Sequence, residues 1–446
     1  MSDYRHINKE ILRLAVPSIL ANITVPLVGI VDTAIVGHLS DAVAIGGIAI
    51  GTMLFDLLYW NFGFLRVGTA GLTAQAWGKN NTAPKETATT SAENTSQILL
   101  QSLSMALIGA AFIWLIQWLF VTVVLALVPC SPEVASFARS YFNIRIWAAP
   151  ATLLLMSLRG WFIGMQNTMA TMITDLTING VNILASWILA VYTPLGTMGV
   201  AWGTLIAQYV GLITAAAILL YKYRLHITKQ MARAALHWRN LKRMFVLNGN
   251  LFIRSLCFMV IYVGFTSLAA KYGDDELAVS SIMMKLFMLF SYFIDGFAYA
   301  GEALTGRFIG ERNGKSLIDS VRVLFVWTIV IGVICTILYA AEGEGMIRLM
   351  TSDVSVIDDS RRYLIWLILM PLISCLAFMW DGIYIGATAG SRLRNSMIWA
   401  AVGFVLTYLL LEHLLGIQAL YVAYFVHLAI RAIYMTVCWR RVKPVF

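Results

Sequence analysis

Long apolar stretches recur along the chain and alternate with short polar gaps. A helix needs about 20 apolar residues to cross the hydrocarbon core of a bilayer. Twelve stretches reach that length, over residues 11–37, 43–76, 97–128, 138–164, 168–192, 198–221, 244–270, 277–309, 317–340, 362–388, 395–413 and 417–438. The pattern predicts an all-α, polytopic membrane protein with twelve transmembrane helices.

The composition agrees with this prediction. Of the 446 residues, 60% are hydrophobic and 12% are charged, whereas soluble domains carry about 25% charged residues. A soluble fold of this length would need more polar surface, but lipid tolerates an apolar exterior. The net charge of +9 does not indicate nucleic acid as a partner, because the cationic residues gather in the short gaps between apolar stretches.

The distribution of positive charge predicts the topology. With twelve spans, both termini lie on one side of the membrane, and the termini and even-numbered loops carry 18 Lys and Arg residues against 4 in the odd-numbered loops. Cytoplasmic loops carry the excess of positive charge, so we expect both termini in the cytoplasm. Residues Met1 to Glu10 are charged and lack an apolar core, and we expect no cleaved signal peptide.

The longest basic gap, 222–243, falls near the middle of the chain. On either side of it, the segment Leu158–Gly164 resembles Trp380–Gly386, and Gly78–Asn81 resembles Gly310–Asn313 at a similar offset. Transporters often consist of such repeats, with the substrate site between them. We therefore predict two bundles of six helices with pseudo-two-fold symmetry. Their bounds are 1–221 for the N-terminal bundle, 222–243 for a basic cytoplasmic linker, and 244–446 for the C-terminal bundle.

Asp32 lies in the first apolar stretch with no basic residue within one helical turn. An ionisable side chain in the hydrocarbon costs at least about 2.5–3.5 kcal/mol, so each one suggests a function. Removal from water disfavours the ionised form of a carboxyl. Pro26, which precedes it in the same stretch, removes a backbone hydrogen bond and can bend the helix. These residues predict a protonation-linked switch with a hinge at Pro26; a hydrated carboxyl near the helix end is the alternative.

A polar stripe is predicted on the span 168–192. Asn179, Asn182 and Ser186 follow one another at intervals of three and four positions, so they share one helix face. Thr204 in the next span could join them. Such stripes either hold helices together or line a water-filled path.

The C-terminal half also contains charged residues within its apolar stretches. Asp295 and Glu302 are two helical turns apart and share a helix face. Lys285 on the same span and Arg254 on the preceding one could pair with either carboxylate, or these residues could take part in coupling. Asp381 lies within the tenth span, where it lines a cavity or pairs with a neighbouring helix.

No signature of metal binding or catalysis is present in the sequence. The five cysteines lie far apart, and no CxxC or Cys/His ligand spacing occurs. The sequence also lacks HExxH, a paired-Asp box and Gly-x-Ser-x-Gly, which mark metalloenzymes and hydrolases. We expect no metal site, no cofactor and no enzymatic activity.

Four strings resemble helix motifs of the multidrug and toxic compound extrusion (MATE) family, in particular its DinF-like branch. They are Val31–Leu39, Phe64–Ala76, Asp295–Ala303 and Asp381–Thr388, in the order of that family's helices 1, 2, 8 and 10. The resemblance covers nearly the whole chain. It implies a V-shaped pair of six-helix bundles around a central cavity, and export of amphipathic, often cationic compounds in exchange for H⁺ or Na⁺.

The resemblance also implies roles for single residues. The family's helix 1 carboxylate corresponds to Asp32, whose protonation would bend helix 1 and release the substrate, and its polar partners correspond to Asn182 and Thr204. Ser186 stands where many members carry an aspartate. Residues 244–270 contain no carboxylate, so the cation site of the NorM-like branch is not expected.

These observations together favour a monomeric H⁺-coupled antiporter in the bacterial plasma membrane that exports amphipathic or cationic small molecules by alternating access. A Na⁺-coupled exporter of the same family is one alternative. A flippase for a lipid-linked saccharide is the other. Such a protein would line its cavity with cations to bind pyrophosphate, and this chain has Arg66, Arg145, Arg159, Arg254 and Lys285 within its apolar stretches.

Overall fold

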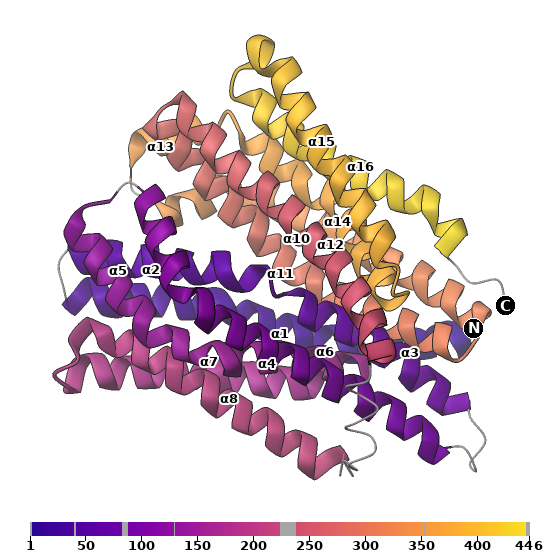
Figure 1. Ribbon diagram of the computed structural model, residues 1–446. Helices are drawn as coiled ribbons and strands as arrows, with labels where there is room; N and C mark the ends of the chain where they lie inside the picture. The colour runs from indigo at the N-terminus through magenta and orange to yellow at the C-terminus, as the bar shows by residue number, and fades with distance from the viewer. Residues whose placement is uncertain are drawn as a thin grey trace. The chain divides into compact units, whose positions relative to one another are not determined.

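The computed structural model describes residues 2–39, 42–82, 88–128, 130–223, 238–351 and 353–442. All regular elements in these ranges are helices, labelled in Figure 1. The α-helices are α1 (Ser2–Leu39), α2 (Ala42–Trp60), α3 (Phe64–Thr82), α4 (Ala88–Leu127), α5 (Pro132–Arg145), α6 (Ala149–Gly164), α7 (Thr168–Tyr192), α8 (Gly199–Tyr223), α10 (Trp238–Ala269), α11 (Asp274–Gly310), α12 (Gly314–Met350), α13 (Val354–Ser360), α14 (Leu364–Gly386), α15 (Gly390–Leu415) and α16 (Gln418–Val442). Most of the predicted linker 222–243, namely residues 224–237, lies outside the described residues.

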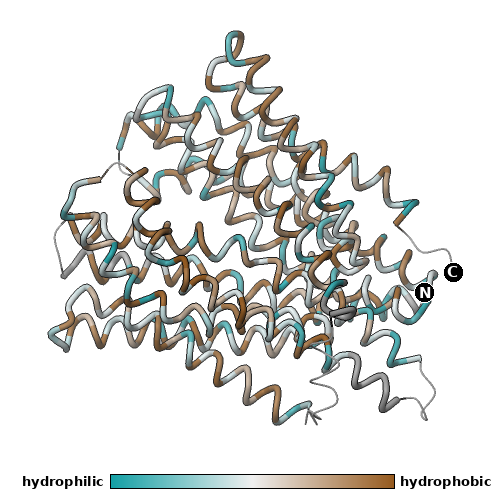
Figure 2. The backbone as a smooth tube through the Cα atoms, viewed as in Figure 1, coloured by the Kyte–Doolittle hydropathy of each residue, from teal (hydrophilic) through white to brown (hydrophobic). Residues whose placement is uncertain are grey.

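Twelve helical segments of the described chain are long and apolar enough to cross a membrane. They are Tyr4–Gly29, Val43–Thr82, Thr95–Leu127, Pro132–Gly164, Thr168–Tyr192, Gly196–Tyr223, Met244–Tyr272, Asp275–Gly310, Gly314–Met350, Leu364–Gly386, Gly390–Leu415 and Gln418–Val442. Figure 2 shows hydrophobic residues along the lengths of these helices and hydrophilic residues at several of their ends. The predicted all-α fold with twelve spans is confirmed.

The chain divides into two compact units. One unit contains Leu20–Ala76 and Ala83–Phe245, and the other contains Met1–Ile19, Trp77–Thr82 and Val246–Phe446. We call them the N-terminal unit and the C-terminal unit. The division differs from the predicted bundles, because Met1–Ile19 and the end of α3 group with the C-terminal helices.

Polar contacts explain this grouping. Within the C-terminal unit, Arg307 of α11 donates to Glu10 of α1 at 2.9 Å and to Glu311 at 2.8 Å. Asn81 at the end of α3 donates to the same Glu311 at 3.0 Å, and Tyr4 donates to Asp319 of α12 at 3.0 Å. Apart from Arg307 and Glu311, which are four positions apart, these partners lie far apart along the chain, so apolar periodicity could not reveal them.

In the N-terminal unit, two glycines hold α6 against α3. A Cβ atom at Gly160 would overlap the backbone carbonyl of Arg66, and a Cβ at Gly164 would lie 2.7 Å from the carbonyl oxygen of Ala70. Glycine permits two backbones to approach this closely. The backbones of α3 and α6 are therefore in direct contact.

In the C-terminal unit, α14 packs closely on α11 at two glycines in the same way. Cβ atoms at Gly382 and Gly386 would overlap the backbone carbonyls of Ala298 and Glu302. Gly160 and Gly382 occupy the same position in the repeated segments Leu158–Gly164 and Trp380–Gly386. The carbonyls that they meet, of Arg66 and Ala298, are as far apart along the chain as the repeated segments that begin at Gly78 and Gly310. Each unit thus packs an equivalent pair of helices through equivalent glycines, as an internal repeat predicts.

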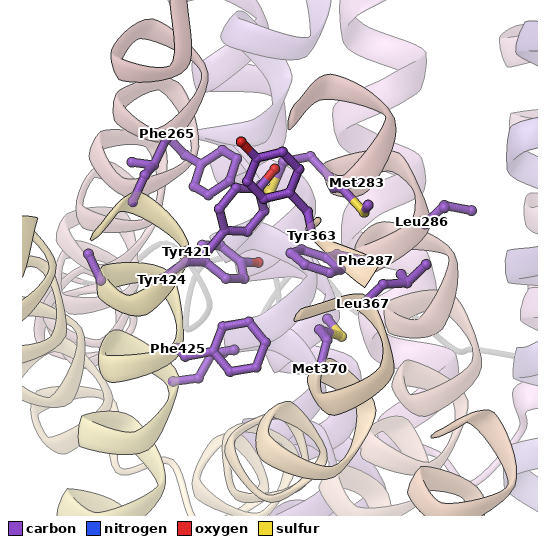
Figure 3. Close-up of a cluster of buried hydrophobic side chains, with 14 of the residues drawn as sticks. Phe265, Met283, Leu286, Phe287, Tyr363, Leu367, Met370, Tyr421, Tyr424 and Phe425 are labelled. Carbon is purple, nitrogen blue, oxygen red and sulfur yellow. The ribbon is translucent and has the colours of Figure 1, made fainter. Parts of the chain in front are cut away.

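An aromatic cluster forms the core of the C-terminal unit (Figure 3). The ring of Tyr421 stacks on Tyr363 with centroids 5.0 Å apart and meets Phe265 edge-on at 5.4 Å. Phe287 stacks on Tyr424 at 5.5 Å. Such pairs contribute about 0.5–1.5 kcal/mol each beyond the burial of their area, and they join α10, α11 and α16 around the start of α14.

We expect Gly382→Ala to destabilise the protein by about 1–3 kcal/mol, the usual cost of overpacking, because its methyl group would overlap backbone atoms that cannot rotate away. Gly249→Ala is the matched control, since its Cβ would meet nothing within 4 Å. Thermal unfolding of the purified variants in detergent measures the difference. Equal melting temperatures for the two variants would show that the contact between α11 and α14 does not depend on glycine.

Candidate functional site

Asp32 lies on α1 in the N-terminal unit and is half-buried. The side chains of Ser186 on α7 and Arg145 on α5 lie near its carboxyl, and the hydroxyl of Ser186 has no hydrogen-bond partner among the described atoms. Among the described residues, the buried oxygen Oδ1 of Asp32 has no hydrogen-bond partner. Asp32 is therefore a carboxyl within a helix bundle that retains an unused acceptor.

Helix α1 continues unbroken through Pro26, the predicted hinge. The proline nitrogen carries no hydrogen to donate back along the helix. The hydroxyl of Thr24 donates to the carbonyl of Ala21 at 2.7 Å in the turn before it. In this structure, α1 is one continuous helix from Ser2 to Leu39, and Pro26 within it donates no backbone hydrogen bond.

The predicted polar stripe on α7 contacts both of its neighbours in the N-terminal unit. Asn179 donates to the hydroxyl of Thr24 on α1 at 2.5 Å, and Asn182 donates to the hydroxyl of Thr204 on α8 at 2.9 Å. Ser186 is fully buried, and it packs so closely on Gly203 of α8 that a Cβ atom at Gly203 would overlap it. The stripe holds α1, α7 and α8 together. The side-chain oxygen of Asn182, one helical turn before Ser186, has no partner among the described atoms.

Arg145 is a further residue of this site, which the sequence linked to the flippase alternative and not to Asp32. It donates to the hydroxyl of Tyr141 at 3.1 Å and lies over the ring of Phe55 at 4.7 Å. Its charge acts on Asp32 and also on Asp56 of α2. The available signal was the interval of four positions between Tyr141 and Arg145, which places them on one helix face.

A separate ion pair joins α6 and α7 in the same unit. Arg159 Nη2 lies 2.5 Å from Asp175 Oδ1, and the two side chains are 27% and 16% exposed. This pair neutralises Arg159, one of the cations that a pyrophosphate site would require. The charge at the Asp32 site comes from two carboxylates, Asp32 and Asp56, and one guanidinium.

In the C-terminal unit, the sequence left two alternatives for Arg254, namely an ion pair with Asp295 or Glu302 and a part in coupling. It forms its ion pair with Asp381 of α14 at 2.5 Å, and Arg431 of α16 contacts the same carboxylate at 2.6 Å. Arg431 is buried, and the sequence analysis did not name it. A cation inside the apolar stretch 417–438 should have suggested a functional role or an ion pair.

The remaining predicted charges of this half lie on α11. Lys285 is exposed, Asp295 is half-buried and Glu302 is fully buried. The structure thus brings Asp381 and Arg254 together and leaves Lys285 at the surface. Within the described residues, there is no group of three or more His, Cys, Asp and Glu residues that could hold a metal ion.

Comparisons with known proteins agree on one family. The model of the MatE family matches residues 17–188 and 251–411, which together include the polar stripe of α7, Arg254 and Asp381. The chain is 36% identical to DNA damage-inducible protein F of Escherichia coli, over 97% of this chain and 92% of that protein. It is 24% identical to Protein DETOXIFICATION 44, chloroplastic, of Arabidopsis thaliana, over 96% of this chain and 81% of that protein.

The fold is also that of solved transporters. One structure described as the outward-facing conformation of a multidrug resistance MATE family transporter superposes with a TM-score of 0.87 at 18% identity, covering 98% of this chain and 97% of that chain. The resemblance stated from the motifs is thereby confirmed. The chain belongs to the MatE family, and it is a multi-pass membrane protein of the multidrug and toxin efflux transporters.

Proposed function

We propose that this transporter is an H⁺-coupled antiporter that exports amphipathic cations, and that Asp32 binds the proton and the substrate in turn. The observation that carries the proposal is the position of Asp32. It is half-buried on the helix that contains Pro26, beside Ser186 of α7 and the cation Arg145, and its buried oxygen has no partner among the described residues.

Charge explains why a cation would bind there. Asp32 and Asp56 outnumber Arg145, so the ionised site carries one net negative charge. An opposite charge in a site of low dielectric is attracted much more strongly than in water. Protonation of Asp32 removes the net charge and with it most of this attraction, so proton binding and cation binding exclude each other.

The proton gradient supplies the driving force. Each proton that moves down a potential of 100 mV releases about 2.3 kcal/mol, which biases the exchange toward export. For this direction the termini must face the cytoplasm of a bacterial plasma membrane, as the distribution of Lys and Arg predicts. A monomer suffices, because all the groups invoked belong to one unit of one chain.

Proteoliposomes test the choice of coupling ion. The protein is reconstituted with a fluorescent cationic substrate inside, and either a pH gradient or a Na⁺ gradient is imposed. We expect substrate movement with the pH gradient at constant Na⁺. Movement with the Na⁺ gradient alone would contradict H⁺ coupling and would favour the Na⁺-coupled alternative.

We expect Arg145→Gln to shift the pH midpoint of this transport upward by about one unit, because the variant loses the cation that favours ionised Asp32. Arg139→Gln on the same helix is the control, since Arg139 is not among the groups that act on Asp32. Initial efflux rates across a series of external pH values measure the midpoint. A downward shift, or equal shifts for both variants, would contradict the proposed role of Arg145.

A further inference from the structure

Three charged side chains meet inside the C-terminal unit, and we call them the Arg254 cluster: Arg254, Asp381 and Arg431. Nη2 of Arg254 and Nη2 of Arg431 lie 2.5 Å and 2.6 Å from the same oxygen, Asp381 Oδ2. The side chains are 21%, 8% and 1% exposed in the order Arg254, Asp381 and Arg431. The cluster is thus buried at Arg431 and open at Arg254.

The charges in the cluster do not balance, because two guanidinium groups share one carboxylate. Charge-assisted hydrogen bonds to an oxygen this close hold Asp381 in its ionised form, and the cluster keeps one positive charge. Buried charge without compensation is costly. Among the atoms of the described residues, Arg254 Nε, Arg431 Nε and Arg431 Nη1 have no hydrogen-bond partner. The cluster therefore has three unused donors and a surplus cation.

The neighbouring helices give the cluster an apolar wall. Arg431 Cζ lies 5.6 Å from the centre of the Phe378 ring, one helical turn before Asp381. On α16, the rings of His427 and Tyr424 pack against each other with centroids 4.6 Å apart, and both lie near the charge of Arg431. A bound molecule here would meet aromatic surface beside cationic donors.

Helix α11, which carries Asp295 and Glu302, packs on a different side of α14. Gly382 and Gly386 hold α14 against the backbone of α11, and Asp381 is the neighbour of Gly382 in the sequence, about 100° around the helix. The groups that act on the Asp381 carboxyl are Arg254 and Arg431. The two cations of the cluster, on α10 and α16, thus lie away from the face of α14 that packs on α11.

We propose that Arg254 and Arg431 form a binding site for the anionic group of an amphipathic organic molecule: a carboxylate, a sulfonate or a phosphate. Guanidinium groups suit such oxygens because their N–H donors match the spacing of two anion oxygens. Asp381 Oδ1, which also has no partner within the described chain, would accept a hydroxyl or water of the same ligand. Export of the ligand rests on the function proposed above, whereas its binding does not.

Binding to the purified protein in phosphatidylcholine nanodiscs tests the site. Sulforhodamine B and rhodamine 6G share a xanthene core and differ in the sign of their charge, and fluorescence anisotropy reports the affinity of each. We expect Arg254→Gln to weaken sulforhodamine B binding on the order of tenfold and to change rhodamine 6G binding less than twofold. Lys285→Gln removes an exposed cation of the same unit and should change neither.

Asp381→Asn distinguishes a binding site from a purely structural ion cluster. This variant removes the competing carboxylate, so we expect sulforhodamine B to bind more tightly than to the parent and to raise the variant's melting temperature more than the parent's. Where Arg254→Gln does not fold, Arg254→Lys replaces it, with weaker binding expected because the planar fork is lost. Loss of both dyes in every folded variant, or unchanged sulforhodamine B affinity in Arg254→Gln, would overturn the proposal.

Nanodiscs that contain phosphatidylglycerol identify the source of the anion. Competition by this lipid against sulforhodamine B, lost in Arg254→Gln, would assign the site to lipid headgroups. Undiminished dye binding would assign it to anionic solutes. Both results support an anion site. If Arg254→Gln leaves dye binding unchanged, the anion site is disproved, and the test of H⁺ coupling through Asp32 is unaffected.

Discussion

Asp32→Asn is expected to lower pH-driven efflux at least about tenfold, because an amide cannot exchange a proton and presents no negative charge to a cation. The substitution preserves the shape of the side chain, and Asp32 accepts no hydrogen bond at its buried Oδ1 from the described residues. We therefore expect the variant to fold and to melt within a few degrees of the parent. Substrate efflux from proteoliposomes with an imposed pH gradient measures the effect.

Asp56→Asn is the companion variant for this experiment. Asp56 contributes negative charge beside Arg145 but is exposed on α2, so its loss should weaken binding of the cation while the efflux that remains keeps its dependence on pH. Efflux by Asp32→Asn at the parent's rate and with the parent's pH dependence would remove Asp32 from the mechanism. Equal losses in both variants would assign the coupling to the two carboxylates jointly.

Arg159→Leu is expected to destabilise the N-terminal unit by about 3 kcal/mol, since it leaves the carboxylate of Asp175 without its cation inside the bundle. The double variant Arg159→Leu/Asp175→Leu removes both charges, and we expect it to recover more than half of that loss. Denaturant unfolding of the purified proteins measures the three free energies.

The double variant separates charge from packing. A coupling energy near zero between the two substitutions would mean that Arg159 stabilises the unit through the packing of its stem and not through its ion pair. Transport should be preserved in the double variant where it folds, because neither residue acts on Asp32.

The twelve spans could be predicted because the length of an apolar stretch is a local property of the sequence. The ends of the spans were less accurate, because polar contacts extend helices beyond their apolar parts. The predicted span 138–164 begins at Pro132, where Ser131 caps the backbone N–H of Val134 at 3.3 Å. The predicted span 317–340 continues to Met350, where Glu344 accepts hydrogen bonds from Arg348 and Arg361 at 2.7 Å and 2.8 Å.

The family and the repeat were also readable from the sequence, since motifs such as Asp381–Thr388 contain the glycines that bring helix backbones together. The partners of the charged residues were not. Which cation meets Asp381 depends on how α10 and α16 are rotated around α14, and no interval along the chain encodes that rotation. The proximity of Arg145 to Asp32 and the role of Arg431 were missed for the same reason, because each arginine has partners on other helices.

Exchange of a proton for a substrate at Asp32 can be observed directly. When a cationic substrate is added to the purified transporter in weakly buffered solution near the midpoint of its pH dependence, a pH indicator records any proton released. We predict that the parent releases protons in proportion to the substrate bound and that Asp32→Asn releases none. Substrate binding to the parent without proton release, or equal release from the variant, would contradict the account.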